Sequence, residues 1–200
     1  MDLDPLEIVE KAKPQEADAK ASWLNPAVAI TVALLATFMG ICKVKDDNIV
    51  QAMQQAQADK LDHWQFYQAR NIREEIAKST LTQLRLQALT AQPSQQAAFD
   101  EQITVYAALA KDQNQKKDEL KAQAEKDQST YDALNFRDDQ FDLSDAAIAI
   151  AISLLAVASL TQLSWLYALA LLPSGFGVLM GLAGLMGWGI HPDALIKLLS

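Results

Sequence analysis

The sequence lacks most of the groups on which catalytic and metal sites are built. It has one cysteine, Cys42, which excludes a disulfide bond within the chain. It has two histidines, and neither has a cysteine or a carboxylate at zinc-binding spacing. It contains no phosphate-binding glycine loop, dinucleotide fingerprint or nucleophile–base pair. We therefore predict no metal, no cofactor and no enzymatic activity.

Basic residues are scarce relative to acidic ones. The chain has 17 Lys and Arg against 25 Asp and Glu, which gives a net charge of −8. Nucleic-acid binding needs a basic surface, and docking on anionic lipid needs a polybasic patch. The excess of acid therefore argues against both modes, and we expect no nucleic-acid partner.

Charged residues are absent altogether from two stretches, residues 24–42 and 146–190. A helix needs about 20 apolar residues to cross a bilayer, so the first stretch is long enough for one crossing and the second for two. A soluble domain has no interior that could bury a charge-free run of the second length. The sequence therefore predicts three transmembrane helices in a lipid bilayer.

Glycine and proline are nearly absent from the polar region between these stretches. No glycine lies between residues 41 and 174, and Pro93 is the only proline within residues 44–143. Two helices of similar length that meet near Pro93 would each be roughly 70 Å long. Because both must return to the same membrane surface, we expect an antiparallel helical hairpin between spans 1 and 2, with its turn near residues 90–95.

Apolar residues in the second arm of this hairpin recur at alternating steps of four and three, as in a coiled coil. The series is Phe99, Ile103, Tyr106, Ala110, Gln113, Lys117, Leu120, Ala124, Asp127, Tyr131 and Leu134. The first arm is less regular, and its candidate contact residues are Ile49, Met53, Ala56, Leu61, Trp64, Ile72, Ile76, Leu81 and Leu84. We expect a coiled-coil-like hairpin with a polar middle, completed by neighbouring copies of the chain.

The predicted fold is all-α and has five segments. They are an acidic N-terminal tail with a short amphipathic helix (1–22), transmembrane helix 1 (23–43), the soluble hairpin (44–143), transmembrane helices 2 and 3 (144–190) and an interfacial C-terminal tail (191–200). Within the fourth segment, Pro173, Ser174 and Gly175 predict a tight turn between the last two spans.

Lysine and arginine near the membrane predict the orientation, because they favour the cytoplasmic side. The hairpin side and the C-terminal tail together carry Lys43, Lys45, Lys60, Lys126, Arg137 and Lys197. The opposite side carries fewer, namely Lys11, Lys13 and Lys20. The hairpin is therefore expected in the cytoplasm.

Three aromatic residues lie within four positions of the first arm. Trp64, Phe66 and Tyr67 span more than one helix face, so one contact face cannot bury all three. At least one should meet another chain or a protein partner. Together with Arg70 and Arg73, they form the candidate interaction site on the hairpin.

Small residues predict where the membrane helices pack closely. Gly177 and Gly181 form a G-x-x-x-G pair, followed by Gly184, and such residues allow close approach of helices in lipid. The approach is either to span 2 of the same chain or to another subunit. Gln162, expected in mid-membrane, should bind a partner across a helix interface.

A charge cluster is expected where the hairpin meets the membrane. Residues equidistant from Pro93 bring two lysines to three acids, in the set Lys43, Lys45, Asp138, Asp139 and Asp142. In one interpretation the acids pair with the lysines near a helix start. In the other they form a ring in a symmetric oligomer, at the mouth of a cation pathway. The absence of ionisable groups from the spans argues against conduction.

Three runs of the sequence resemble one known family. They are residues 29–40 (AITVALLATFMG), 44–49 (VKDDNI) and 63–75 (HWQFYQARNIREE). With them, the chain resembles the bacterial family catalogued as domain of unknown function 4337. The resemblance implies a bacterial membrane protein and supplies no activity, cofactor or catalytic residue.

These observations predict a homo-oligomeric scaffold or assembly protein of the bacterial inner membrane, with a projecting coiled-coil hairpin and no catalytic activity. Excess aromatic surface, a partly polar contact face and small residues in the spans all favour self-assembly. Two alternatives are an oligomeric channel-like pore with an acidic ring at its mouth, and an accessory subunit of a larger membrane complex that docks its partner on the hairpin.

Overall fold

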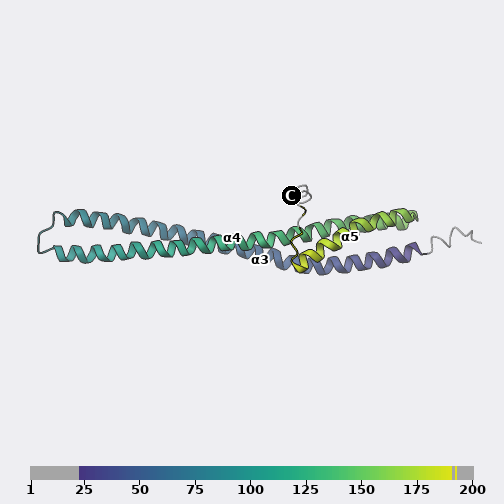
Figure 1. Ribbon diagram of the computed structural model, residues 1–200, viewed down its shortest axis with the longest axis horizontal. Coiled ribbons are helices and arrows are strands. Elements are labelled where there is room, and N and C mark those ends of the chain that lie inside the picture. The colour runs from purple at the N-terminus through teal and green to yellow at the C-terminus, as the bar shows by residue number, and fades with distance from the viewer. Residues whose placement is uncertain (1–22, 191, 193–200) are drawn as a thin grey trace, which may run out of the picture. The chain divides into compact units, whose positions relative to one another are not determined.

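The computed structural model describes residues 23–190 and residue 192. Within them the chain forms three α-helices and no strand: α3 (Leu24–Ala88), α4 (Gln96–Thr161) and α5 (Ser164–Met186), as Figure 1 shows. The predicted all-α class is therefore confirmed. The tail predicted for residues 1–22 lies outside the described residues, as does the tail predicted for residues 191–200 except for residue 192.

The described chain divides into two compact units. The first unit contains the residues up to Ile49 and those from Phe136 onward, and the second unit is Val50–Asn135. Both α3 and α4 contribute residues to both units, whereas α5 belongs to the first unit alone.

The core of the first unit is apolar and draws on all three helices. Its buried residues are Leu24, Val28, Leu35, Ile148, Ala151, Leu155 and Ala170. Large apolar side chains also lie on the outside of this unit, among them Ile30, Leu34 and Leu172. Each of the three helices contains a stretch long and apolar enough to cross a membrane. An apolar exterior around an apolar core is compatible with a membrane protein.

The chain turns between α4 and α5 at residues 162–163, so the turn predicted at residues 173–175 was wrong. Gln162 adopts the left-handed conformation with φ 56°. Pro173 instead lies inside α5. The hydroxyl of Ser174 donates a hydrogen bond of 2.7 Å to the Ala170 carbonyl, which gives this buried hydroxyl a partner within the helix.

The start of α3 lies beside the α4–α5 turn. Oδ1 of Asn25 accepts hydrogen bonds from Ser159 Oγ and from Gln162 Nε2, each 2.9 Å long. Trp23 packs edge-on against Tyr167 with ring centroids 5.9 Å apart. Gln162 therefore has the predicted partner on another helix, but it lies in the turn rather than in the middle of a span.

Side chains of α4 donate hydrogen bonds to backbone carbonyls at the C-terminal end of α5 and just after it. The last carbonyls of a helix have no partner within it. Nε and Nη2 of Arg137 donate to the Gly184 carbonyl at 3.1 and 2.8 Å. Nε2 of the buried Gln140 donates to the Trp188 and Ile190 carbonyls at 2.8 and 2.6 Å. Gly187, at φ 70°, ends the helix in the left-handed conformation that glycine allows.

In the second unit, α3 and α4 lie side by side (Figure 1). The face of α3 toward α4 follows alternating steps of three and four residues without a break. Its positions are Met53, Ala56, Lys60, His63, Tyr67, Arg70, Glu74, Ala77, Leu81 and Leu84. Met53, Ala56, Glu74 and Ala77 are buried. Leu61, Ile72 and Ile76, which we predicted at this face, are instead exposed. That prediction was wrong because it followed the apolar residues rather than the constant spacing.

The contact face of α4 agrees with the predicted series. Its three polar positions each meet a polar residue of α3. The pairs are Arg70 Nη1 to Gln113 Oε1 at 3.0 Å, Lys117 Nζ to Glu74 Oε2 at 2.6 Å, and His63 Nδ1 to Asp127 Oδ2 at 2.6 Å. The middle of the helix pair is therefore polar, as expected.

Candidate interaction sites

The aromatic segment of α3 buries two of its three rings in part. Trp64 and Tyr67 pack edge-on, with centroids 5.2 Å apart and planes at 78°. Phe66 remains 60% exposed. The prediction that one contact face cannot bury all three rings therefore agrees with the structure.

The two arginines of the predicted interaction site have different surroundings. Arg70 lies at the contact face and donates to Gln113 of α4. Arg73 is exposed. Of the five predicted residues, the structure thus leaves Phe66 and Arg73 open to a partner, whereas Trp64, Tyr67 and Arg70 are partly buried within the helix pair.

The side of α3 that points away from α4 is low in charge. We call it the outer face of α3, and its positions within the second unit are Gln54, Gln55, Ala58, Leu61, Asp62, Gln65, Gln68, Ala69, Ile72, Glu75, Ile76, Ser79, Thr82, Gln83 and Leu86. Four large apolar side chains there, Leu61, Ile72, Ile76 and Leu86, are between 52% and 61% exposed. Asp62 and Glu75 are its only charged residues.

The equivalent side of α4 is highly charged. We call it the outer face of α4, and within the second unit it runs from Ala97 to Ala133 at the same spacing. Its charged residues are Glu101, Lys111, Asp112, Asp118, Glu119, Glu125, Lys126 and Asp132. All are exposed. This composition is typical of a face in contact with water, and the outer face of α3 does not share it.

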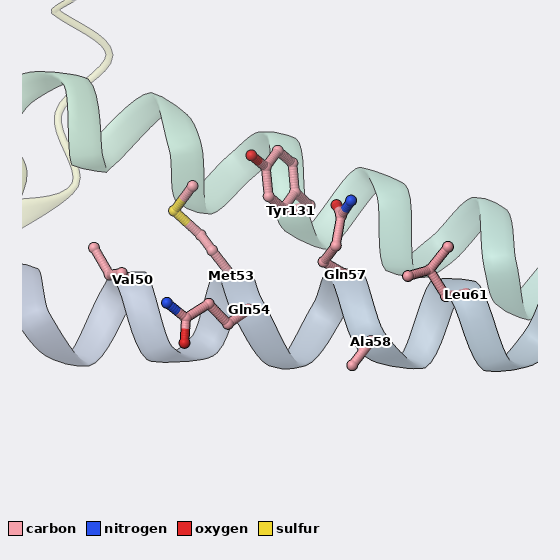
Figure 2. A pocket seen from close by; sticks show the side chains of 7 residues that line it. All are labelled: Val50, Met53, Gln54, Gln57, Ala58, Leu61 and Tyr131. Carbon is pink, nitrogen blue, oxygen red and sulfur yellow. The ribbon is translucent and has the colours of Figure 1, made fainter.

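A shallow groove of about 390 Å³ continues the outer face of α3 toward its N-terminal side. Figure 2 shows Tyr131 of α4 on one side of the groove and six side chains of α3 on the other. The α3 residues are Val50, Met53, Gln54, Gln57, Ala58 and Leu61. Leu61 belongs to both features, so the groove and the exposed apolar residues form one surface.

A buried carboxylate lies at the centre of the helix pair. Glu74 is 1% exposed, and it lies 2.6 Å from Lys117 Nζ and 2.6 Å from Lys78 Nζ. Asn114 Nδ2 donates to it at 3.1 Å. The hydrogen bonds from Lys117 and Lys78 lower the pKa of Glu74 to about 2, against the opposing effect of burial.

The expected pairing of the two lysines with the acids of α4 differs from the structure. Lys43 Nζ lies 2.8 Å from Asp46 Oδ2 and 3.6 Å from Asp47 Oδ1, both on α3. Residues three and four positions apart on one helix are neighbours, so these acids compete with those of α4. Lys45 is exposed. Among residues 23–190, the ion pairs of Lys43 are therefore within α3.

The acids of α4 interact with Asp46. Asp46 is only 4% exposed, and its charge acts on Asp138 and Asp142 of α4. Burial raises the pKa of Asp138 to about 7, and the neighbouring carboxylates of Asp46, Asp142 and Asp139 raise it further.

Asp142 contributes to the same electrostatic environment. Burial and the charge of Asp46 raise its pKa, whereas the charge of Lys43 lowers it. Among the described residues, no group of three or more His, Cys, Asp and Glu is arranged to hold a metal ion. The chemistry that this cluster offers on its own is the binding of a proton at Asp138.

The glycines of α5 contact the same chain. A Cβ atom on Gly177 would lie 2.7 Å from Ile148 Cγ1 and 3.1 Å from the Ser144 carbonyl oxygen. On Gly181 it would lie 2.6 Å from Phe38 Cε1, and on Gly184 2.8 Å from Phe141 Cζ. Of the two predicted roles, packing within one chain is therefore present, and it involves α3 as well as α4.

Several residues of these sites were not predicted. Asp46 and Gln140 were not predicted as site residues, and Arg137 was counted only for the orientation, although Asp46 follows Lys43 by three positions and Arg137 precedes two predicted acids. The turn at Gln162 also had a signal, because Ser159, Thr161, Gln162 and Ser164 are the densest polar cluster in the long charge-free stretch.

The described chain is thus an all-helical protein with three helices apolar enough to cross a membrane and a polar helix pair. Residues 24–187 match the model of the family Domain of unknown function (DUF4337). The chain belongs to this family, as the three sequence runs indicated. No curated protein and no solved structure matches it.

Proposed function

We propose that this protein is a homo-oligomeric scaffold or assembly protein of the bacterial inner membrane, without catalytic activity. In this proposal α3, the end of α4 and α5 cross the bilayer. The polar helix pair is a coiled-coil hairpin in the cytoplasm, as the distribution of lysine and arginine favours. Copies of the hairpin associate and offer a surface on which other proteins assemble.

One observation carries the proposal: the middle of the helix pair has polar residues inside, and α3 carries large apolar residues outside. Lys60, His63, Arg70 and Glu74 face α4, where a stable coiled coil has apolar side chains. Most of the stability of a helix comes from packing an apolar face. The apolar residues of α3 that could supply this packing point outward, so they need a further surface.

The groove supports the same conclusion. Val50, Met53, Ala58 and Leu61 line an open apolar surface in the water-facing unit of the proposal. Phe66, at 60% exposure, adds a large ring. Exposed apolar surface of this kind on a soluble helix pair is typical of an interface with another protein.

The test is native mass spectrometry of the full-length chain, extracted gently from the membranes in which it is made. We expect one homo-oligomeric mass and no monomer at the concentrations found in membranes. A monomer bound to one foreign chain would overturn the proposal in favour of an accessory subunit. A homo-oligomer that conducts ions in planar bilayers would overturn it in favour of a pore.

A further inference from the structure

We propose that the outer face of α3 packs against the outer face of α3 in a second copy of this chain. This inference rests on the proposed homo-oligomer and adds the surface through which it forms. Its first support is the contrast between the two outer faces. The outer face of α4 carries eight acids and bases between Glu101 and Asp132, seven of them from Lys111 onward, whereas that of α3 carries only Asp62 and Glu75 among apolar, glutamine and other uncharged residues.

The charge pattern of the outer face of α3 indicates which kind of partner it can bind. An anionic lipid surface would require lysine or arginine beside the apolar residues, and the outer face of α3 has none. A strongly charged protein or nucleic acid would find no complementary charge there. A surface that is itself low in charge, apolar and rich in glutamine amides fits, and the same face of a second copy has these properties.

Membrane anchoring orients the two copies so that their equivalent faces can pack against each other. Two chains inserted in the same direction present Ile72 and Ile76 on the same side of one bilayer, so each apolar residue can meet its own equivalent. A twofold interface of this type uses the same patch on both partners. Confinement to a membrane also raises the effective concentration of one copy around another.

The size of the face fits an interaction that depends on this confinement. From Gln54 to Leu86 the helix is about 50 Å long, and a helix contact strip is roughly 10 Å wide. The two copies would therefore bury about 1,000 Å² together, which is at the lower limit for a specific interface. The groove beside Leu61 extends the face and would receive side chains of the partner.

Disulfide cross-linking in membranes tests the surface directly. Cysteine is introduced one residue at a time on the outer face of α3, as Gln65→Cys, Ile72→Cys or Ser79→Cys. Matched control positions on the outer face of α4 are Ala122→Cys and Ser129→Cys. All five positions are exposed, so the changes leave the helix pair intact. The unmodified chain, whose only cysteine is the buried Cys42, measures background.

We expect a covalent dimer from the three α3 positions in at least about tenfold higher yield than from the two α4 positions. A homo-oligomer by mass spectrometry whose α4 positions cross-link equally or better would overturn this surface and leave the proposed function standing. A monomeric chain without cross-links at any position would overturn both.

A second variant measures the energetic role of the apolar residues. The double substitution Ile72→Lys/Ile76→Lys places like charges on both copies, and we expect self-association to weaken by about tenfold or more. The control Ala122→Lys/Ser129→Lys changes the outer face of α4 by the same charge. Unchanged association of the α3 variant, with its helix content retained, would also overturn the inference.

Discussion

Oε2 of Glu74 lies 2.6 Å from Nζ of Lys117, joining α3 to α4 through a carboxylate that is 1% exposed. The same carboxylate accepts from Lys78, on the next turn of its own helix, at 2.6 Å. A buried charge is costly unless it is paired and hydrogen-bonded, so this arrangement makes the middle of the helix pair dependent on the ionised state of one side chain.

The first prediction concerns the pH dependence of this contact. Because the pKa of Glu74 is lowered to about 2, its contribution to stability is present above about pH 4.5 and is lost as the pH falls toward 2. We expect Glu74→Gln to lower the thermal midpoint at pH 7 by a few degrees, and to lower it less and less on acidification. Circular dichroism between pH 7 and 2 measures both effects.

The matched control for this prediction is Glu125→Gln, on the outer face of α4. Its side chain is 63% exposed, so the substitution should leave the midpoint nearly unchanged at every pH. Equal effects of the two substitutions would show that the buried position of Glu74 has no energetic consequence.

A second prediction concerns the glycines of α5. Gly177→Ala should destabilise the first unit by about 1–3 kcal/mol, because the added Cβ meets backbone atoms of Ser144 and Ile148 that cannot move aside alone. Gly175→Ala is the control, since nothing lies within 4 Å of its Cβ position. Thermal unfolding in detergent compares the two, and a similar midpoint for both variants would contradict the packing described here.

A third prediction concerns the end of α5. Arg137→Gln removes both guanidinium hydrogen bonds to the Gly184 carbonyl, and hydrogen bonds from charged groups contribute about 1.5–3 kcal/mol. We expect faster hydrogen exchange in residues 184–190, with little change in the second unit. Arg137→Lys retains the charge without the two-pronged geometry and should give an intermediate result. Unchanged exchange in Arg137→Gln would contradict this role.

A fourth prediction concerns the carboxyl pair between α3 and α4. Because the pKa of Asp138 is raised from 3.8 to about 7, the folded state binds this proton more tightly than the unfolded state does. Stability should therefore fall as the pH rises through this range. Asp138→Asn has no charge to gain, so its thermal midpoint should be higher than that of the unmodified chain at pH 8 and nearly equal at pH 4.

The control for the carboxyl pair is Asp47→Asn. Asp47 lies next to Asp46 on α3 and its side chain is 60% exposed. This substitution should leave the pH dependence of the unmodified chain in place. A pH dependence that persists in Asp138→Asn would assign it to other groups of the cluster.

The sequence predicted the helical class, the long polar helices and the polar positions of α4, because charge-free stretches and a constant heptad spacing are strong signals. It did not predict the contact face of α3. There the constant spacing selects Lys60, His63, Arg70 and Glu74, and the more apolar neighbours Leu61, Ile72 and Ile76 point away. When hydrophobicity and spacing disagree in this way, hydrophobicity alone identifies the wrong face.

The turn and the charge cluster illustrate a second limit. Pro173 predicted a turn, yet a helix among apolar neighbours accommodates a proline, and the chain turns at Gln162 instead. Lys43 was expected to reach the acids of α4, but two acids on its own helix lie closer. In both cases the outcome depends on competition between partners, which a single sequence pattern does not rank.

The polar pairs between α3 and α4 also oppose sliding of one helix along the other. If α4 moved by one seven-residue repeat in one direction, Arg70 would face Leu120 and His63 would face Leu134. Movement the other way would set Glu74 against Ala110. Each shift leaves a polar group without its partner, so one alignment is favoured over its neighbours. A pair of helices with leucines at the contact face would be more stable but could slip by one repeat. The polar pairs lower the stability of this helix pair and fix its register, and therefore its length.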